Sequence, residues 1–228
     1  MNIKPLYVFK ASHFSPSFCD RVIEEGEKLK ILTGATLGLK GKLGSNTDAR
    51  DSKLAFFDFE PQFQWLYDAV LEPVFAANKQ HWRFHVSACE PMQYTTYETG
   101  QFYGWHPDQH SEPYPDGPFK GMTRKLSVTI QLSDPGDYDG GDFEVRDYCD
   151  YDARQTLTTM RPRGSVCTTS VKTMPAPPTA RDARFWKCQS FATPSIAEYW
   201  HIGDTVMRLR AVTERNVIGV KICGVVSR

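Results

Sequence analysis

The sequence has no apolar run long enough to cross a membrane and no excess of charge of either sign. Lys plus Arg and Asp plus Glu number 27 each, so the formal net charge is zero. A membrane helix needs about 18 or more consecutive apolar residues, and the first ten residues carry two lysines where a signal peptide has an apolar core. We therefore predict a cytoplasmic protein that does not enter membranes. The lack of a basic run also disfavours nucleic acid as a partner.

Paired cysteines are missing as well. No C-x-x-C pair occurs, which disfavours a zinc knuckle or a dithiol redox motif. Isolated cysteines fit reduced thiols in a reducing compartment. We assign no role to the six, which are Cys19, Cys89, Cys149, Cys167, Cys188 and Cys223.

The first third of the chain predicts two helices and a flexible connection. After a short strand at Leu6–Phe9, the pair Ser15-Pro16 is a typical helix start, and this helix is expected to pack outside a sheet. Gly, Lys, Asn and Asp dominate Thr33–Ser52, which predicts a mobile surface loop, either a substrate lid or a plain solvated connection. A second amphipathic helix is predicted over Gln62–Lys79, with Phe75 on its buried side.

Strands dominate the rest of the chain. Alternating and β-branched residues predict them at 53–59, 82–86, 91–97, 124–133, 142–146 and 217–226. The prolines of Gln109–Gly121 predict a loop. We expect one domain spanning residues 1–228, mainly β with flanking helices (α+β), in the form of a β-sandwich or jelly roll.

The segment Tyr97–Asp108 carries the candidate chemistry and reads YETGQFYGWHPD. His106 and Asp108 are separated by one residue, so on an extended strand both side chains point to the same face and can converge on one metal ion. One imidazole and one carboxylate are two of the three ligands of the facial triad that binds iron(II) in non-haem oxygenases. By itself the triplet also fits an exposed His and Asp that bind no metal.

Two longer sequence blocks accompany this triplet, one ending in it and one following it. They are QYTTYETGQFYGWHPD over Gln93–Asp108 and RKLSVTIQLSDPGDYDGGDFEV over Arg124–Val145. In this order they resemble the iron(II)- and 2-oxoglutarate-dependent dioxygenases of the prolyl 4-hydroxylase-like group, the PKHD-type hydroxylases. The resemblance covers about residues 6–166. It implies a double-stranded β-helix (jelly roll, cupin-like) with iron(II) on His106 and Asp108, 2-oxoglutarate as cosubstrate and ascorbate as a candidate accessory reductant.

The same resemblance implies an activity. A hydroxylase of this group uses dioxygen to hydroxylate a C–H bond, here of a peptidyl prolyl or related amino-acid residue, with succinate and CO2 as coproducts. Tyr97 stands where related enzymes place a cosubstrate contact, and the alternative is a tyrosine packed in the barrel wall. Tyr103 and Trp105 either line the substrate opening or belong to the core. His110 is expected to face solvent or substrate and not to bind iron.

The likeness stops abruptly after Val166, and residues 167–228 form an atypical tail. A second histidine and a basic residue for the distal carboxylate of 2-oxoglutarate are expected there. The one histidine in the tail is His201, which is either the third iron ligand or a plain surface or interface histidine. Arg210 is the candidate cosubstrate ligand, although its offset from His201 requires a bulge to turn it to the right face.

Two explanations of the tail stay open. It is either a native family tail with a long insertion, or a segment read in another frame or replaced. In the second case iron has two protein ligands, and the protein is a catalytically impaired jelly-roll module that binds a peptide or a sugar. A cupin-like metal enzyme without 2-oxoglutarate fits the fold class but not the two blocks. The sequence leaves the substrate and the oligomeric state open.

Overall fold

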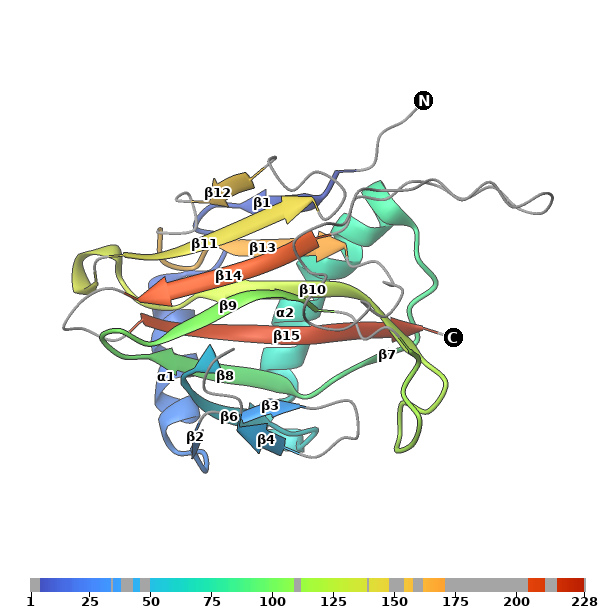
Figure 1. Ribbon diagram of the computed structural model, residues 1–228, viewed down its shortest axis with the longest axis horizontal. Coiled ribbons are helices and arrows are strands. Elements are labelled where there is room, and N and C mark those ends of the chain that lie inside the picture. The colour runs from blue at the N-terminus through green and yellow to red at the C-terminus, as the bar shows by residue number, and fades with distance from the viewer. Residues whose placement is uncertain are drawn as a thin grey trace, which may run out of the picture.

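Two antiparallel sheets lie face to face, and two helices cover the outer face of the larger sheet (Figure 1). The computed structural model describes residues 5–33, 35–37, 43–45, 50–108, 112–138, 140–147, 154–157, 162–170, 205–211 and 217–227. Helices and strands are both present, so the fold is mixed α and β, with strands dominating. Of the helices that the structure describes, none is long and apolar enough to cross a membrane.

The larger sheet has the order β1-β13-β10-β15-β8-β6-β2, and β7 also pairs with β15. Its strands are β1 (Tyr7–Lys10), β2 (Leu32–Thr33), β6 (Lys53–Phe57), β7 (Ala88–Cys89), β8 (Met92–Tyr97), β10 (Thr123–Gln131), β13 (Val166–Ser170) and β15 (Val217–Ser227). The predicted final strand is confirmed as β15, which lies between β10 and β8 instead of at an edge.

The smaller sheet has the order β12-β11-β14-β9-β5. Its strands are β5 (Arg50–Asp51), β9 (Phe102–Pro107), β11 (Gly140–Asp147), β12 (Arg154–Leu157) and β14 (Thr205–Ala211). A separate hairpin consists of β3 (Ala35–Leu37) and β4 (Leu43–Ser45). The atypical tail therefore supplies a central strand to each sheet, β14 to the smaller and β15 to the larger.

Local sequence explains where the helices begin. Helix α1 (Pro16–Glu27) starts after Ser15, whose Oγ accepts a hydrogen bond from the Phe18 backbone N–H at 3.2 Å. Helix α2 (Gln64–Ala77) follows the short 3-10 helix η1 (Pro61–Phe63) and continues into the π-helical turn η2 (Asn78–Trp82). A third short helix, η3 (Pro135–Asp137), forms the turn after β10.

The apolar core lies between the helices and the larger sheet. The alternate residues Leu126, Val128 and Ile130 of β10 are buried against the helices, as the period of a strand requires. Tyr67 of α2 ties this layer together, because its hydroxyl donates to the Phe57 carbonyl at 2.5 Å and accepts from the Met92 N–H at 3.2 Å. Burial raises the pKa of Tyr67 to about 12, so the hydroxyl stays protonated and able to donate.

Three expectations from the sequence were wrong. Thr33–Ser52 was expected to be a loop, but it contains the β3–β4 hairpin and β5. The strand expected at 82–86 is absent, since Trp82 ends η2 and Arg83 follows with a left-handed φ of 59°. The aromatic alternation there reflects packing on the core, not a strand. Phe75 was expected to be buried and is 46% exposed.

Gly26 allows α1 to pack closely on the larger sheet. A Cβ built at this position would lie 2.6 Å from carbons of the Tyr94 ring on β8, which is far inside van der Waals contact. We expect Gly26→Ala to destabilise the fold by about 1–3 kcal/mol through overpacking, which exceeds the gain of about 1 kcal/mol from helix propensity. Urea denaturation measures this change.

Glu24→Ala is the matched control, because Glu24 is an exposed residue of the same helix. Its free energy of unfolding should change by no more than about 0.5 kcal/mol. A Gly26→Ala variant that is as stable as the wild type or more stable would contradict the packing argument.

Candidate metal centre

His106 and Asp108 meet at the C-terminal end of β9. The Nε2 atom of His106 lies 3.2 Å from Oδ1 of Asp108, and the Nδ1 atom lies 2.7 Å from the Gly104 carbonyl oxygen. A carbonyl only accepts, so Nδ1 carries the proton that it donates, and in the neutral imidazole the Nε2 lone pair faces the carboxylate. Two ligand atoms bound at right angles, each about 2.1 Å from an ion, lie about 3 Å apart. The pair therefore has the spacing of two adjacent ligands of one ion.

A β-bulge places the residues around this pair. Along β9, Tyr103 pairs with Leu209 of β14 and His106 pairs with Met207, so three steps on β9 oppose two steps on β14. Strict alternation would put Tyr103 and His106 on opposite faces, and the extra residue puts them on the same face. Their rings are stacked at 3.5 Å between centroids with 12° between planes.

Besides stacking on His106, the Tyr103 ring contacts Arg50 and the cluster that contains Tyr97. Arg50 of β5 pairs with Tyr103 in the ladder, and its guanidinium carbon lies 4.3 Å from the Tyr103 ring centroid. Tyr97, the predicted cosubstrate contact, is buried in a cluster with Tyr138 against which Tyr103 packs. The structure therefore brings Tyr97 to the neighbourhood of the His106 site.

One member of a buried ion pair donates a hydrogen bond to the backbone of Asp108. Arg124 Nη1 donates to the Asp108 carbonyl at 2.7 Å, while its Nη2 lies 2.9 Å from Oε2 of Glu90. The Tyr114 hydroxyl donates a further hydrogen bond to Glu90. Burial raises the pKa of Glu90, and the Arg124 charge opposes that rise. The sequence interpretation missed this role, although Arg124 shares the alternation of Leu126 and Val128, which is a signal for a buried arginine.

Strand β14 brings the tail to the site. Its N-terminal end runs beside the C-terminal end of β9, and the register position opposite His106 is Met207. His201 lies outside the residues that the structure describes, four positions before β14 begins at Thr205. Arg210 pairs with Phe102, at the other end of β9 from His106. His201 as a metal ligand and Arg210 as a cosubstrate ligand stay predictions.

Two of the three expected donors fit an iron(II) ion. A neutral imidazole and a carboxylate suit a borderline cation in the facial arrangement. Among the described residues no group of three or more His, Cys, Asp and Glu side chains comes together. The described donor set is therefore one imidazole and one carboxylate, and a complete facial triad would need a third donor from outside the described residues.

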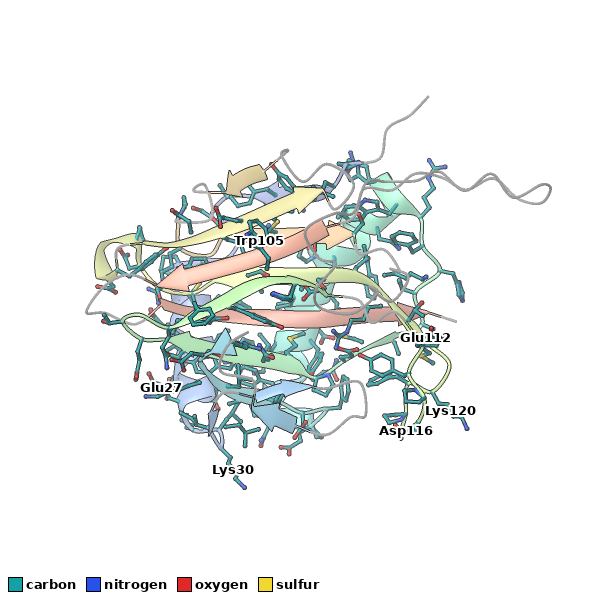
Figure 2. All side chains as sticks on the ribbon, in the orientation of Figure 1. Glu27, Lys30, Trp105, Glu112, Asp116 and Lys120 are labelled. Carbon is teal, nitrogen blue, oxygen red and sulfur yellow. The ribbon has the colours of Figure 1, made fainter. Side chains whose placement is uncertain are left out.

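The predicted substrate-opening residues lie on different sides of β9. Trp105 precedes His106 and takes the opposite face, half-buried, and Figure 2 labels it in the middle of the smaller sheet. Glu112, Asp116 and Lys120 lie well away from it, on the connection between β9 and β10 (Figure 2). Within its described residues, 112–122, this connection has no strand, as its prolines predicted. His110 lies outside the described residues.

Curated proteins resemble about half of this chain. No family model matches the chain. A PKHD-type hydroxylase of Sphingopyxis alaskensis is 36% identical over 121 residues, which are 52% of this chain and 52% of that protein. The PKHD-type hydroxylase YbiX of Escherichia coli O1:K1 is 31% identical over 139 residues, 58% of this chain and 56% of that protein. The chain is a relative of the PKHD-type hydroxylases. It spans about half the length of the curated relatives it matches.

Solved structures resemble this chain over most of its length. A Pseudomonas putida prolyl-4-hydroxylase has a TM-score of 0.56 at 13% identity, covering 96% of this chain and 92% of that one. A Trichoplax adhaerens prolyl hydroxylase in complex with a hypoxia inducible factor peptide has a TM-score of 0.62 at 11% identity, covering 96% and 83%. At such identities the likeness shows the fold, which in 2-oxoglutarate and iron(II) oxygenases is a jelly roll.

The support of Asp108 by Arg124 can be tested through metal affinity. We expect Arg124→Lys to keep the buried charge but to lose the forked contact to Glu90 and the Asp108 carbonyl. Loss of such an outer contact typically weakens metal binding by about 10- to 100-fold. Calorimetric titration with Co(II), an air-stable substitute for iron(II), measures the affinity. The half-buried neighbour Lys125 provides the reverse swap, Lys125→Arg, which should leave the affinity unchanged. Equal affinities for both variants would contradict the role of Arg124.

The third donor can be located by two substitutions. Structural zinc sites gain about 10–16 kcal/mol of binding free energy from four ligands, so one ligand accounts for about a quarter of that. If His201 is the donor, His201→Ala should therefore weaken Co(II) binding by about 100-fold. In that case Met207→His should gain nothing. If His201 is not a donor, Met207→His should instead tighten binding by a similar factor, because it places an imidazole opposite His106 in the ladder. Unchanged affinity in both variants would rule out a third protein ligand at either position.

Proposed function

We propose that this chain is an iron(II)- and 2-oxoglutarate-dependent dioxygenase that hydroxylates a C–H bond. The observation that carries the proposal is the His106 and Asp108 pair, whose Nε2 and Oδ1 atoms lie 3.2 Å apart at the end of a central strand. The relationship to PKHD-type hydroxylases and the fold of prolyl hydroxylases support the same chemistry.

The chain's own residues have distinct tasks in this reaction. His106 and Asp108 would hold the metal, with the Gly104 carbonyl fixing the imidazole tautomer and Arg124 fixing the backbone carbonyl of Asp108. Tyr97, which is 7% exposed, would donate a hydrogen bond from its hydroxyl to the cosubstrate. When bound, iron(II) and 2-oxoglutarate supply the activation of dioxygen, and the balanced reaction converts R–H, dioxygen and 2-oxoglutarate to R–OH, succinate and CO2.

The proposed substrate is a peptidyl prolyl or related amino-acid residue. Support comes from the neighbours, since one is a prolyl-4-hydroxylase and another was solved with a peptide fragment of hypoxia inducible factor. A peptide and dioxygen are therefore the expected partners. A cytoplasmic location stays a prediction.

We also propose that residues 1–228 act as one domain. The support is topological, because β14 and β15 of the tail each lie between strands of the preceding region. A native tail explains this better than a segment read in another frame, which would carry no strand pattern matched to its neighbours.

The alternative is a binding module with an incomplete iron site. One observation favours it: the register position opposite His106 holds Met207, a thioether that suits soft metals better than iron(II). Such a module would retain the fold and bind a peptide or a sugar without turnover.

Succinate release separates the two functions. Wild-type protein with 2-oxoglutarate, iron(II), ascorbate and prolyl peptides should release succinate, and His106→Ala should reduce the rate by at least about 100-fold through loss of a metal ligand. His85→Ala is the control, because His85 is an exposed histidine outside the site, and it should turn over normally. Wild-type protein that binds metal and 2-oxoglutarate but releases no succinate with any peptide or free amino acid would identify the binding module.

A further inference from the structure

Arg50 is a buried cation between the two sheets. It lies on β5, at the edge of the smaller sheet, and is 3% exposed. Its guanidinium donates to Ser52 Oγ at 2.7 Å, and reaches across to β8 of the larger sheet, where it donates to Gln93 Oε1 and Thr95 Oγ1, each at 3.4 Å.

All the partners of Arg50 in the described part of the chain are neutral. They are two hydroxyls, one amide oxygen and the face of the Tyr103 ring. No carboxylate among the described residues forms an ion pair with it, whereas the other buried arginine, Arg124, is paired with Glu90. A buried charge without a counter-ion is unfavourable, so buried arginines normally face an anion. The 3.4 Å hydrogen bonds are long and leave room for a stronger acceptor.

Arg50 also lies within reach of the candidate metal centre. Its guanidinium carbon is 4.3 Å from the Tyr103 ring centroid, which in turn is 3.5 Å from the His106 ring centroid. The guanidinium carbon and the imidazole centroid are therefore no farther apart than the sum of these two distances. A five-carbon dicarboxylate spans roughly 5–6 Å between its ends, given C–C bonds of about 1.5 Å. A molecule bound to a metal at His106 can therefore place its far end at Arg50.

The face of β8 toward Arg50 is polar along its length. Gln93, Thr95 and Tyr97 alternate on this side and are all buried, while Met92 and Tyr94 face the helices. Polar side chains buried between two sheets are unfavourable unless they bind something polar. This row leads from the Arg50 guanidinium to Tyr97, the predicted cosubstrate contact.

We propose that Arg50 binds the carboxylate of 2-oxoglutarate that lies farthest from the metal. The inference rests on the proposed function and assigns a binding residue on β5, far upstream in the chain from the expected Arg210. The guanidinium offers two parallel N–H donors to a carboxylate, and the anion supplies the counter-charge that the described residues do not. Tyr103 holds the guanidinium in place by stacking on it.

The test compares two ligands that differ at one end. Co(II)-loaded wild type and Arg50→Gln are titrated calorimetrically with 2-oxoglutarate and with 2-oxovalerate, whose chain has the same length but ends in a methyl group. The wild type should bind 2-oxoglutarate about 10- to 100-fold more tightly, as charged hydrogen bonds predict. Arg50→Gln should lose this preference, with its 2-oxovalerate affinity unchanged. Arg83→Gln, at an exposed arginine outside the site, is the control and should keep the preference. Arg210→Gln tests the competing assignment and should keep it as well.

Each other outcome overturns a defined part of the argument. A preference that survives in Arg50→Gln, or that is lost in Arg210→Gln instead, overturns the assignment of Arg50 but leaves the proposed function standing. Wild-type protein that binds neither ligand overturns both. If Arg50→Gln does not fold, Arg50→Lys decides, because it retains the buried charge and loses only the fork. An Arg50→Lys protein with an undiminished preference overturns the assignment.

Discussion

The β-bulge in β9 determines what surrounds His106. One extra residue between Tyr103 and His106 turns the Tyr103 ring onto the same face as His106, where it stacks on the imidazole. The same ring then carries the Arg50 guanidinium on the adjacent strand. Without the bulge the alternation of the strand would direct Tyr103 away from the site, and no side chain would join the arginine to the histidine.

The larger sheet separates two environments. Its helix-side face is apolar and is filled by residues such as Leu126, Val128 and Met92, which provides the main hydrophobic core. On the opposite face of β8, Gln93 and Thr95 are equally buried but polar. Electrostatic interactions strengthen where water is excluded, so the enclosed charges of Arg50 and Asp108 act more strongly on a ligand than surface charges would. The hydrophobic core and the proposed binding site thus lie on opposite sides of the larger sheet.

Local patterns in the sequence predicted what depends on neighbours along the chain. The convergence of His106 and Asp108, the helix start at Ser15 and the alternation of β10 appear in the structure as expected, since spacing alone places these side chains. The role of His106 and Asp108 as metal ligands stays a prediction. Arg50 could not be predicted, because it lies in a Gly- and Asn-rich stretch that is typical of a loop, and its burial depends on pairing with Tyr103. The bulge and the Met207 register also depend on strand pairing between distant segments, for which a single sequence carries no signal.

The central positions of β14 and β15 determine when the protein can fold. Both sheets stay interrupted until the last quarter of the chain has been synthesised, because β15 separates β10 from β8 and β14 separates β11 from β9. A nascent chain that lacks these strands presents four unpaired strand edges, which are templates for intermolecular pairing. The order of synthesis therefore delays the assembly of both sheets, and of the surroundings of His106, until β14 and β15 have been made.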